Sequence, residues 1–309
     1  MRQALLRGTY IVERIQRILV ATDFSPRADQ AVQRAAKLAA GHGAVLYLLH
    51  VLPSFPIEAF KRLMTDTPLE TEQRLYNQAR AILQKRAETL AGEGLDVRHH
   101  VAIGRAHIEI NHYAESHHAD LIVIGDQGES FPQELFLGTT ASKTLRKGRH
   151  PLLIVKQEAT DRYHRILVPV DFSPPSRLAL QMALKVIPAG IAPIEASIHV
   201  LHAVEPFGEM LHGDENTEAI ELYRSRALSR VHHNMENIIA DCAPGDPRVI
   251  SVVEHGFPPD MIRDKARSLD ADLIVIGKRG ETELDEALFG SVTKHVLYET
   301  PCDVLIVSP

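Results

Sequence analysis

The chain contains the same long sequence element twice, and this duplication limits its possible folds more than any other feature. The segment Arg17-Ile-Leu-Val-Ala-Thr-Asp-Phe-Ser-Pro26 returns at positions 165–174 with only two changes. The segment Ala119-Asp-Leu-Ile-Val-Ile-Gly125 returns unchanged at positions 271–277. This period is far longer than the roughly 20 to 50 residues of a solenoid unit. We therefore predict two copies of one domain, over residues 1–158 and 159–309, with the boundary near the polar stretch 157–163.

Each copy alternates short apolar runs with helical periods. The runs ILV and LIVI are continuous rather than alternating, which is typical of strands buried on both faces of a parallel sheet. Ser25-Pro26 and Ser173-Pro174 each supply an N-cap serine and a proline for the first helical position. The pattern predicts an α/β fold with two doubly wound, Rossmann-like parallel sheets of five strands each. Such sheets bind ligands at the carboxyl ends of their strands.

A glycine-rich loop follows the fourth predicted strand of each copy. It reads Gly125-Asp-Gln-Gly128, nine residues and Gly138-Thr139 in the first copy, and Gly277-Lys-Arg-Gly280, nine residues and Gly290-Ser291 in the second. Glycine at a strand end lets the backbone approach a ligand, and the last glycine opens a helix whose N-terminus suits phosphate. The alternative is that these glycines only turn the chain. The repetition at identical internal spacing favours a phosphate site.

An aspartate ends the first predicted strand of each copy, at Asp23 and Asp171. A carboxylate at this place in a doubly wound sheet can bind ribose hydroxyls. The sequence Asp-Phe-Ser-Pro equally suits a turn in which the aspartate only caps the backbone. The residues alone leave both interpretations open.

Together, the strand pattern, the aspartate and both loops resemble the universal stress protein family, whose signature is G-2x-G-9x-G-(S/T). The resemblance covers roughly residues 15–156 and 163–309. It implies the strand order 3-2-1-4-5, ATP binding in one subgroup, pairing of domains through the fifth strand, and a cytoplasmic stress-response role with little or no catalysis. The fifth strands are Leu152–Val155 and Val304–Val307, so we expect an intramolecular pseudo-dimer.

The resemblance also assigns nucleotide-contacting positions in both copies. In the second copy they are Pro169, Asp171, Ala203, Ile276, Gly277, Gly280, Gly290, Ser291, Val292 and Thr293. In the first copy they are Asp23, Val51, Ile124, Gly125, Gly128, Gly138, Thr139 and Thr140. The family's Gly-Ser-Val-Thr is intact at positions 290–293 and becomes Gly-Thr-Thr-Ala at positions 138–141.

The loop charges also differ between the copies. Lys278 and Arg279 stand where the first copy has Asp126 and Gln127. Because ATP carries several negative charges, the loop charges and the intact motif predict tighter binding in the second copy.

Several other classes of site have no support in the sequence. There is no GxxxxGK[ST] of a P-loop NTPase and no GxGxxG after the first strand. The net charge of −6 gives no basic footprint for nucleic acid. The adjacent histidine pairs point apart on a helix or strand, so we predict no metal site. Cys242 and Cys302 lack the spacing of a disulfide or zinc framework and are expected to be unreactive.

The leading function is an ATP-binding regulatory module of the cytoplasm, with Mg²⁺ accompanying the nucleotide. The chain start lacks an apolar signal core and no run is long enough to span a membrane, so we expect neither export nor membrane insertion. One alternative is a slow ATPase or autophosphorylating enzyme that uses Ser291, Thr293 or Thr139 as phosphoacceptor, although no general base stands out. The other is an interaction scaffold without nucleotide. Protein partners are unknown, and homodimerisation through another face stays open.

Overall fold

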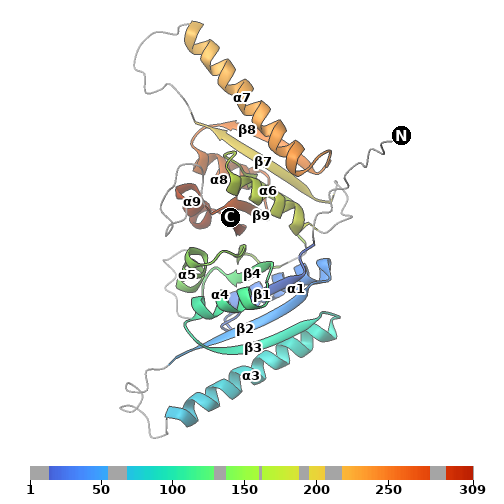
Figure 1. Cartoon of the computed structure of the whole chain (residues 1–309), viewed down its shortest axis with the longest axis vertical. Coiled ribbons are helices and arrows are strands. Elements are labelled where there is room, and N and C mark those ends of the chain that lie inside the picture. The colour runs from blue at the N-terminus through green and yellow to red at the C-terminus, as the bar shows by residue number, and fades with distance from the viewer. Residues whose placement is uncertain are drawn as a thin grey trace, which may run out of the picture.

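The computed structural model describes residues 14–54, 68–128, 137–159, 162–187, 195–205, 218–278 and 290–308. The predicted site residue Gly280 and the loop residue Arg279 lie outside these ranges. Two α/β halves follow one another along an elongated molecule (Figure 1).

The first half alternates strands and helices as predicted. Its elements are β1 (Arg17–Ala21), α1 (Pro26–His42), β2 (Val45–Pro53), α3 (Pro68–Gly92), β3 (Val97–Gly104), α4 (Ala106–Ser116), β4 (Leu121–Gly125), α5 (Thr139–Lys147) and β5 (Leu152–Val155). The second half repeats this order. Its elements are β6 (Arg165–Pro169), α6 (Pro174–Val186), β7 (Ser197–Val204), α7 (Glu218–Cys242), β8 (Val249–His255), α8 (Pro258–Ser268), β9 (Leu273–Gly277), α9 (Ser291–Glu299) and β10 (Asp303–Val307).

All ten strands belong to one sheet, in the order β3-β2-β1-β4-β5-β10-β9-β6-β7-β8. Each half is parallel and has the order 3-2-1-4-5, as predicted. The halves join through antiparallel pairing of β5 with β10, in which Val304 lies opposite Ile154 and Ile306 opposite Leu152. The predicted pseudo-dimer through the fifth strands is therefore confirmed. The pairing covers two apolar strands that would otherwise be exposed sheet edges.

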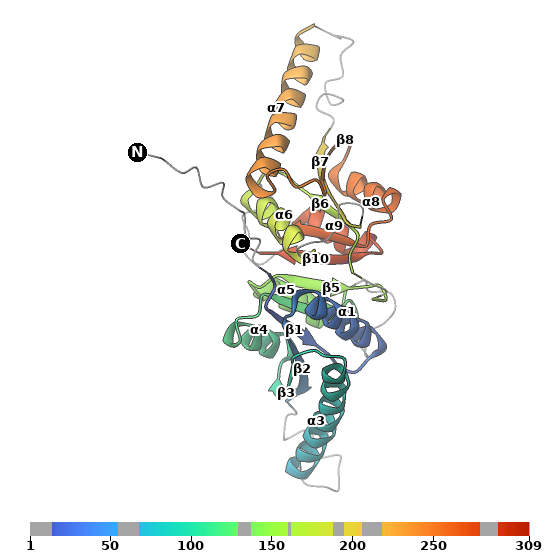
Figure 2. The ribbon, with the colours of Figure 1, turned by 90° about the vertical axis from the view of Figure 1, so that its right-hand side faces the viewer.

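Helices cover both faces of the sheet, and the core on each face continues across the junction. One core packs side chains of α1, α3, α6 and α7 against the strands, and the other packs those of α4, α5, α8 and α9. Figure 2 shows β5 and β10 side by side at the middle of the molecule, between the helices of the first half and those of the second. Leu153 and Leu305, opposite each other in the junction pairing, belong to the first core. The junction is therefore part of the hydrophobic core rather than a contact between two surfaces.

The repeated Ala-Asp before each fourth strand has a structural role. Asp120 accepts backbone N–H groups from Gln16 and Arg17, where the chain enters β1. Asp272 does the same for His164 and Arg165 at the entry to β6. These carboxylates replace ladder partners that strand ends lack.

A buried polar cluster lies at one end of the β5–β10 pairing. The Asp303 carboxylate, at the start of β10, is fully buried and accepts hydrogen bonds from the backbone N–H groups of Lys156 and Gln157 and from the Tyr163 hydroxyl. Arg34 Nε of α1 lies 3.3 Å from Asp303 Oδ2, and its guanidinium covers the Tyr163 ring at 4.3 Å. Burial, followed by the Asp303 charge, raises the pKa of Tyr163 well above its ordinary value. The cluster therefore links residues at both ends of the segment that connects the halves to Arg34 in the first half and Asp303 in the second.

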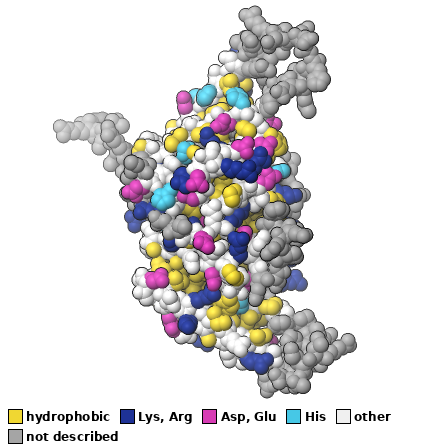
Figure 3. Space-filling view, turned by 180° about the vertical axis from the view of Figure 1, so that it is seen from behind, with side chains coloured by type: hydrophobic (Ala, Val, Ile, Leu, Met, Phe, Trp, Pro, Cys, Tyr) yellow, Lys and Arg dark blue, Asp and Glu magenta, His cyan; other side chains and the backbone are white. Residues whose placement is uncertain are grey.

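The surface is mixed in charge. Figure 3 shows Lys and Arg side chains interspersed with Asp and Glu on one face of both halves. Within the ranges given above, none of the helices has the length and apolarity needed to cross a bilayer.

Burial raises the pKa of the Cys302 thiol to about 11, so this cysteine is a protonated thiol at neutral pH, which supports its predicted lack of reactivity.

Candidate functional site

Each half has a cavity at the carboxyl ends of its strands. The cavity of the second half has a volume of about 380 Å³ and lies among the ends of β6, β7 and β9 and the start of α9. That of the first half, about 650 Å³, lies at the corresponding place among β1, β2, β4 and α5. Both volumes are in the range of small-molecule pockets. The cavities are where a doubly wound sheet is expected to bind a ligand.

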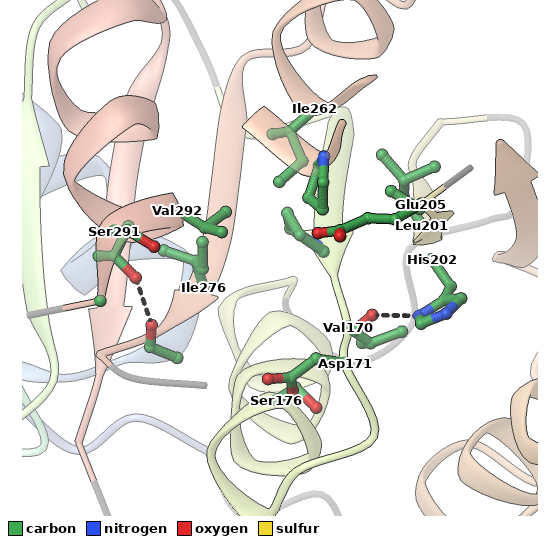
Figure 4. Close-up of a pocket in the computed structure, with 16 residues that line it drawn as sticks. Val170, Asp171, Ser176, Leu201, His202, Glu205, Ile262, Ile276, Ser291 and Val292 are labelled. Carbon is green, nitrogen blue, oxygen red and sulfur yellow. Dashed lines mark hydrogen bonds between the residues drawn. The ribbon is translucent and has the colours of Figure 1, made fainter. Parts of the chain in front are cut away.

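The predicted site residues gather around these two cavities. The second cavity is lined by Pro169, Asp171, Ala203, Ile276, Gly277, Gly290, Ser291, Val292 and Thr293. The first is lined by Asp23, Val51, Ile124, Gly125, Gly128, Gly138, Thr139 and Thr140. Figure 4 shows Ile276, Ser291 and Val292 on one side of the second cavity and Leu201, His202 and Glu205 on the other, with Asp171 between them. Sequence positions far apart in the chain are therefore brought together as predicted.

The turn after the first strand of each half is held in the same way twice. Asp23 Oδ1 accepts the Ser25 N–H at 3.1 Å, and Asp171 Oδ1 accepts the Ser173 N–H at the same distance. Ser25 and Ser173 in turn cap α1 and α6. One carboxylate oxygen of each aspartate therefore shapes the turn, as the capping interpretation predicted. Both aspartates also line a cavity, so capping and ligand contact are compatible.

The residue after each aspartate adopts an unusual backbone conformation. Phe24 has φ 67° and Phe172 has φ 65°, a region that bulky residues rarely occupy. Each ring is stacked on a histidine of the neighbouring strand, Phe24 on His50 at 4.2 Å and Phe172 on His202 at 4.4 Å. The stacking holds the strained turn beside the cavity.

The two histidines also bind the backbone of this turn. His50 Nδ1 donates to the Thr22 carbonyl and His202 Nδ1 to the Val170 carbonyl, each at 2.8 Å. Burial lowers the pKa of His50 below its ordinary value, which favours the neutral ring. These contacts agree with the interpretation of both histidines as packed structural residues rather than acid-base catalysts.

The helices α5 and α9 begin at the cavities without a side-chain cap. Their N-cap residues are Gly138 and Gly290, whose own N–H groups bind the carbonyls of Asp126 and Lys278. The first intrahelical bonds run from Ser142 to Gly138 and from Lys294 to Gly290. The N–H groups of the first turn have no partner within the helix, and the helix dipole makes this end attractive to an anion.

The strand-end glycines line the cavities and also have a packing role that the sequence did not predict. A Cβ on Gly125 would lie 2.9 Å from the Arg27 carbonyl oxygen, and a Cβ on Gly277 would lie 2.8 Å from Pro175 Cβ. Both glycines therefore allow the strand end to pack tightly on the first turn of α1 or α6. Gly128 faces the site more directly, since a Cβ there would lie 2.6 Å from Asp23 Oδ2.

Two polar side chains near the second loop are engaged in hydrogen bonds with backbone carbonyls. Lys278 is buried, and its ammonium donates to the carbonyls of Arg146 and Gly148 in the first half. It is not among the cavity-lining residues, so the prediction that its charge attracts phosphate was wrong. The Thr293 hydroxyl is buried and donates to the Gly277 carbonyl at 2.9 Å. Thr293 is therefore a poor phosphoacceptor.

Sequence reasoning missed the far side of each cavity. Pro258 and Ile262 of α8 line the second cavity, and Ala106 and Ile110 of α4 line the first at the corresponding positions. Glu205 extends from the β7 side toward the middle of the second cavity (Figure 4). The repeat aligns these α4 positions with these α8 positions, and both copies have an apolar residue at each of them. That shared apolar character was the available signal in the sequence. Nothing local marked Glu205.

The charged lining of the cavities is acidic in the part of the chain that the structure describes. Asp171 and Glu205 line the second cavity and Asp23 the first, and neither described lining contains a lysine or arginine. A polyphosphate there would rely on backbone N–H groups and on a bound cation.

Comparisons with known proteins agree with the fold of both halves. The sequence model of the universal stress protein family matches residues 14–156 and 162–308. A universal stress protein of Mycolicibacterium smegmatis is 26% identical over 306 residues, covering 94% of this chain and 97% of its own. Universal stress protein G of Shigella flexneri is 34% identical over 128 residues, covering 41% of this chain and 88% of its own. The crystal structure of a universal stress protein from Archaeoglobus fulgidus superposes with a TM-score of 0.68 at 19% identity, covering 94% of this chain and 98% of its own.

Proposed function

Since this chain belongs to the universal stress protein family, we propose that it binds ATP, accompanied by Mg²⁺, and acts as a regulatory module of the cytoplasmic stress response. The observation that carries the proposal is the same in both halves. An uncapped helix N-terminus and a strand-end carboxylate line one cavity, in the first half at α5 and Asp23 and in the second at α9 and Asp171.

The residues fit the parts of ATP by their chemistry. The N–H groups at the start of α5 and α9 suit phosphate oxygens. The carboxylates of Asp23 and Asp171 suit ribose hydroxyls, and the apolar wall formed by Leu201 and Ile262 in the second half suits a purine ring. Mg²⁺ would offset the repulsion between the phosphates and the acidic lining through its positive charge. In proteins it typically binds one or two carboxylates together with phosphate oxygens.

Calorimetric titration of the purified chain with MgATP tests the proposal, together with mass spectrometry of any nucleotide that co-purifies. Asp171→Ala should weaken binding at the second site by about 1–3 kcal/mol, the scale of a lost charge-assisted hydrogen bond. Asp23→Ala should do the same at the first site. Asp241→Ala removes an exposed carboxylate that lines neither cavity and serves as the control. A folded chain that shows no binding isotherm and carries no nucleotide would contradict the proposal.

The same variants compare the two halves. We infer that the second half binds more tightly because Thr293, which stands where the first half has Ala141, fixes the start of α9 to the Gly277 carbonyl at the end of β9. The Lys278 charge does not contribute to this difference, because the ammonium is directed to the first half. The chain carrying Asp23→Ala should therefore retain the tighter of the two sites. Equal residual affinities in the two variants would refute this asymmetry.

A slow ATPase or autophosphorylating enzyme is the alternative use of the same cavities. The commitment of Thr293 to the Gly277 carbonyl leaves Ser291 and Thr139 as the candidate acceptors. Incubation with γ-labelled ATP separates the alternatives, since a binding module releases no phosphate and takes up no label.

A further inference from the structure

The phosphate-facing helices α5 and α9 end at the junction between the halves. Figure 2 shows α5 close to β5 and α9 close to β10. The last carbonyl groups of a helix have no partner within it and carry the negative end of the helix dipole. Each of these two ends receives a lysine ammonium.

Each lysine comes from one half and binds the helix end of the other half. Lys278 of the second half donates to the carbonyls of Arg146 and Gly148, at the end of α5, at 3.3 and 3.2 Å. Lys156 of the first half donates to the carbonyls of Leu297 and Thr300, at the end of α9, at 2.8 and 2.7 Å.

These contacts are made from unrelated positions of the repeat. In the first half, Asp126 occupies the position of Lys278, and an acidic side chain there cannot donate to the end of α9. Lys156 supplies the donor instead, and Ser308 occupies its position in the second half. Lys278 is buried and Lys156 is partly buried, and burial lowers the pKa of Lys156 below its ordinary value. Burying an ammonium group is unfavourable unless the group is hydrogen-bonded. The carbonyl acceptors at the helix ends therefore explain why these ammonium groups can lie inside the junction.

Lys278 connects both cavities through hydrogen bonds. Its backbone carbonyl accepts the N–H of Gly290, the N-cap of α9 at the second cavity. Its side chain holds the end of α5, whose other end faces the first cavity. On the opposite side, Lys156 follows Val155, whose carbonyl accepts the Asp126 N–H in the loop of the first cavity.

We propose that Lys278 and Lys156 are positioning residues that each hold the phosphate-facing helix of the opposite half and so couple the two ATP sites. This inference rests on the proposed ATP binding. A helix that loses its anchor spends less time in the binding orientation, and apparent affinity falls in proportion to the competent fraction.

The test measures one site at a time in the full chain. With the second site weakened by Asp171→Ala, Lys278→Met should weaken MgATP binding at the first site by about three- to tenfold, the scale of a charge at a helix end. Lys278→Arg keeps a donor and should restore part of the affinity. Lys147→Met removes an exposed lysine from the last turn of the same helix, where solvent screens its charge, and should weaken affinity by less than about twofold. In the reciprocal test, Lys156→Met should weaken the second site when Asp23→Ala has weakened the first.

A second measurement needs no change at either lysine. In the Asp23→Ala chain, MgATP loads the second site, and hydrogen exchange of the amides at 144–148 should slow as α5 is held more firmly. Unchanged first-site affinity in folded Lys278→Met would overturn the inference, as would unchanged exchange at 144–148. Absence of MgATP binding to the unmodified chain would instead overturn the proposed function, so the two failures are distinguishable.

Discussion

Replacing the buried carboxylate of Asp303 tests how the two halves are held together. Asp303→Asn keeps the size of the side chain and removes its charge. In the folded protein, Oδ1 accepts the N–H groups of Lys156 and Gln157, and Oδ2 accepts the Tyr163 hydroxyl. Arg34 adds an ion pair to Oδ2 at 3.3 Å, with only 4% of its side chain exposed.

The expected loss follows from the donors around this position. An asparagine has one acceptor oxygen, so its NH₂ group must face either the two backbone N–H groups or the Arg34 guanidinium. Removing one partner of a buried ion pair destabilises a protein by about 3–5 kcal/mol because the other charge stays buried. That is a large share of a typical unfolding free energy of about 5–15 kcal/mol.

The chain itself suggests the compensating change. Met182 occupies in α6 the position that Arg34 occupies in α1, and it is buried. With Arg34→Met added to Asp303→Asn, the oxygen of the introduced amide can accept the two backbone N–H groups and its NH₂ can donate to the Tyr163 hydroxyl. We expect the double variant to recover all but about 1–2 kcal/mol, the scale of an altered hydrogen bond.

Urea unfolding followed by far-ultraviolet circular dichroism measures these differences, since the chain has no tryptophan. The coupling energy of the double-mutant cycle should be negative in sign, meaning that the second change relieves the first. An Asp303→Asn variant within about 1 kcal/mol of the unmodified chain, or a double variant as unstable as the single one, would refute the reasoning about a buried charge.

Three further outcomes follow from the structure. Ile154→Lys or Ile306→Lys places a charge in the fully buried β5–β10 pairing and should destabilise the chain by more than about 4 kcal/mol; two silent variants in thermal melts would argue against the junction. Glu205→Gln removes a negative charge from the second cavity and should tighten MgATP binding several-fold at low salt, whereas weaker binding would mean that Glu205 contacts the ligand favourably. Burial lowers the pKa of His50, so its contribution to stability is complete above its ordinary pKa of about 6.5 and declines as the pH falls below that value; a smaller loss between pH 7 and 5 in His50→Phe than in the unmodified chain would check this.

The arrangement of the halves was predictable because it depends on patterns that repeat. Continuous apolar runs predicted parallel strands, and the resemblance to the universal stress protein family implied their order and the pairing of the apolar fifth strands. The site was predictable for a related reason. The carboxyl ends of parallel strands share one edge of a sheet, so the aspartates and the glycine loops meet there whatever the loops between them contain.

The individual side chains were less predictable. Lys278 was placed beside the phosphate from its position in a glycine loop, yet it lies against the other half. Gly125 and Gly277 were interpreted only as room for a ligand, and the structure shows that they also make room for a helix. The spacing of residues along the chain does not show in which direction a side chain points or how closely a helix approaches a strand end.

The duplication, the parallel strands, the capped first helices and the edge at which a ligand would bind were all legible in the residues. These features depend on local periodicity, on turn chemistry and on the limited number of ways in which parallel strands can connect. The partners of the buried charges at the junction, in contrast, are set only when the chain is folded. Asp303, Arg34, Lys156 and Lys278 lie far apart along the chain, and their partners are chosen by packing two halves onto one continuous sheet, where a buried charge must find whatever donor or acceptor lies within reach.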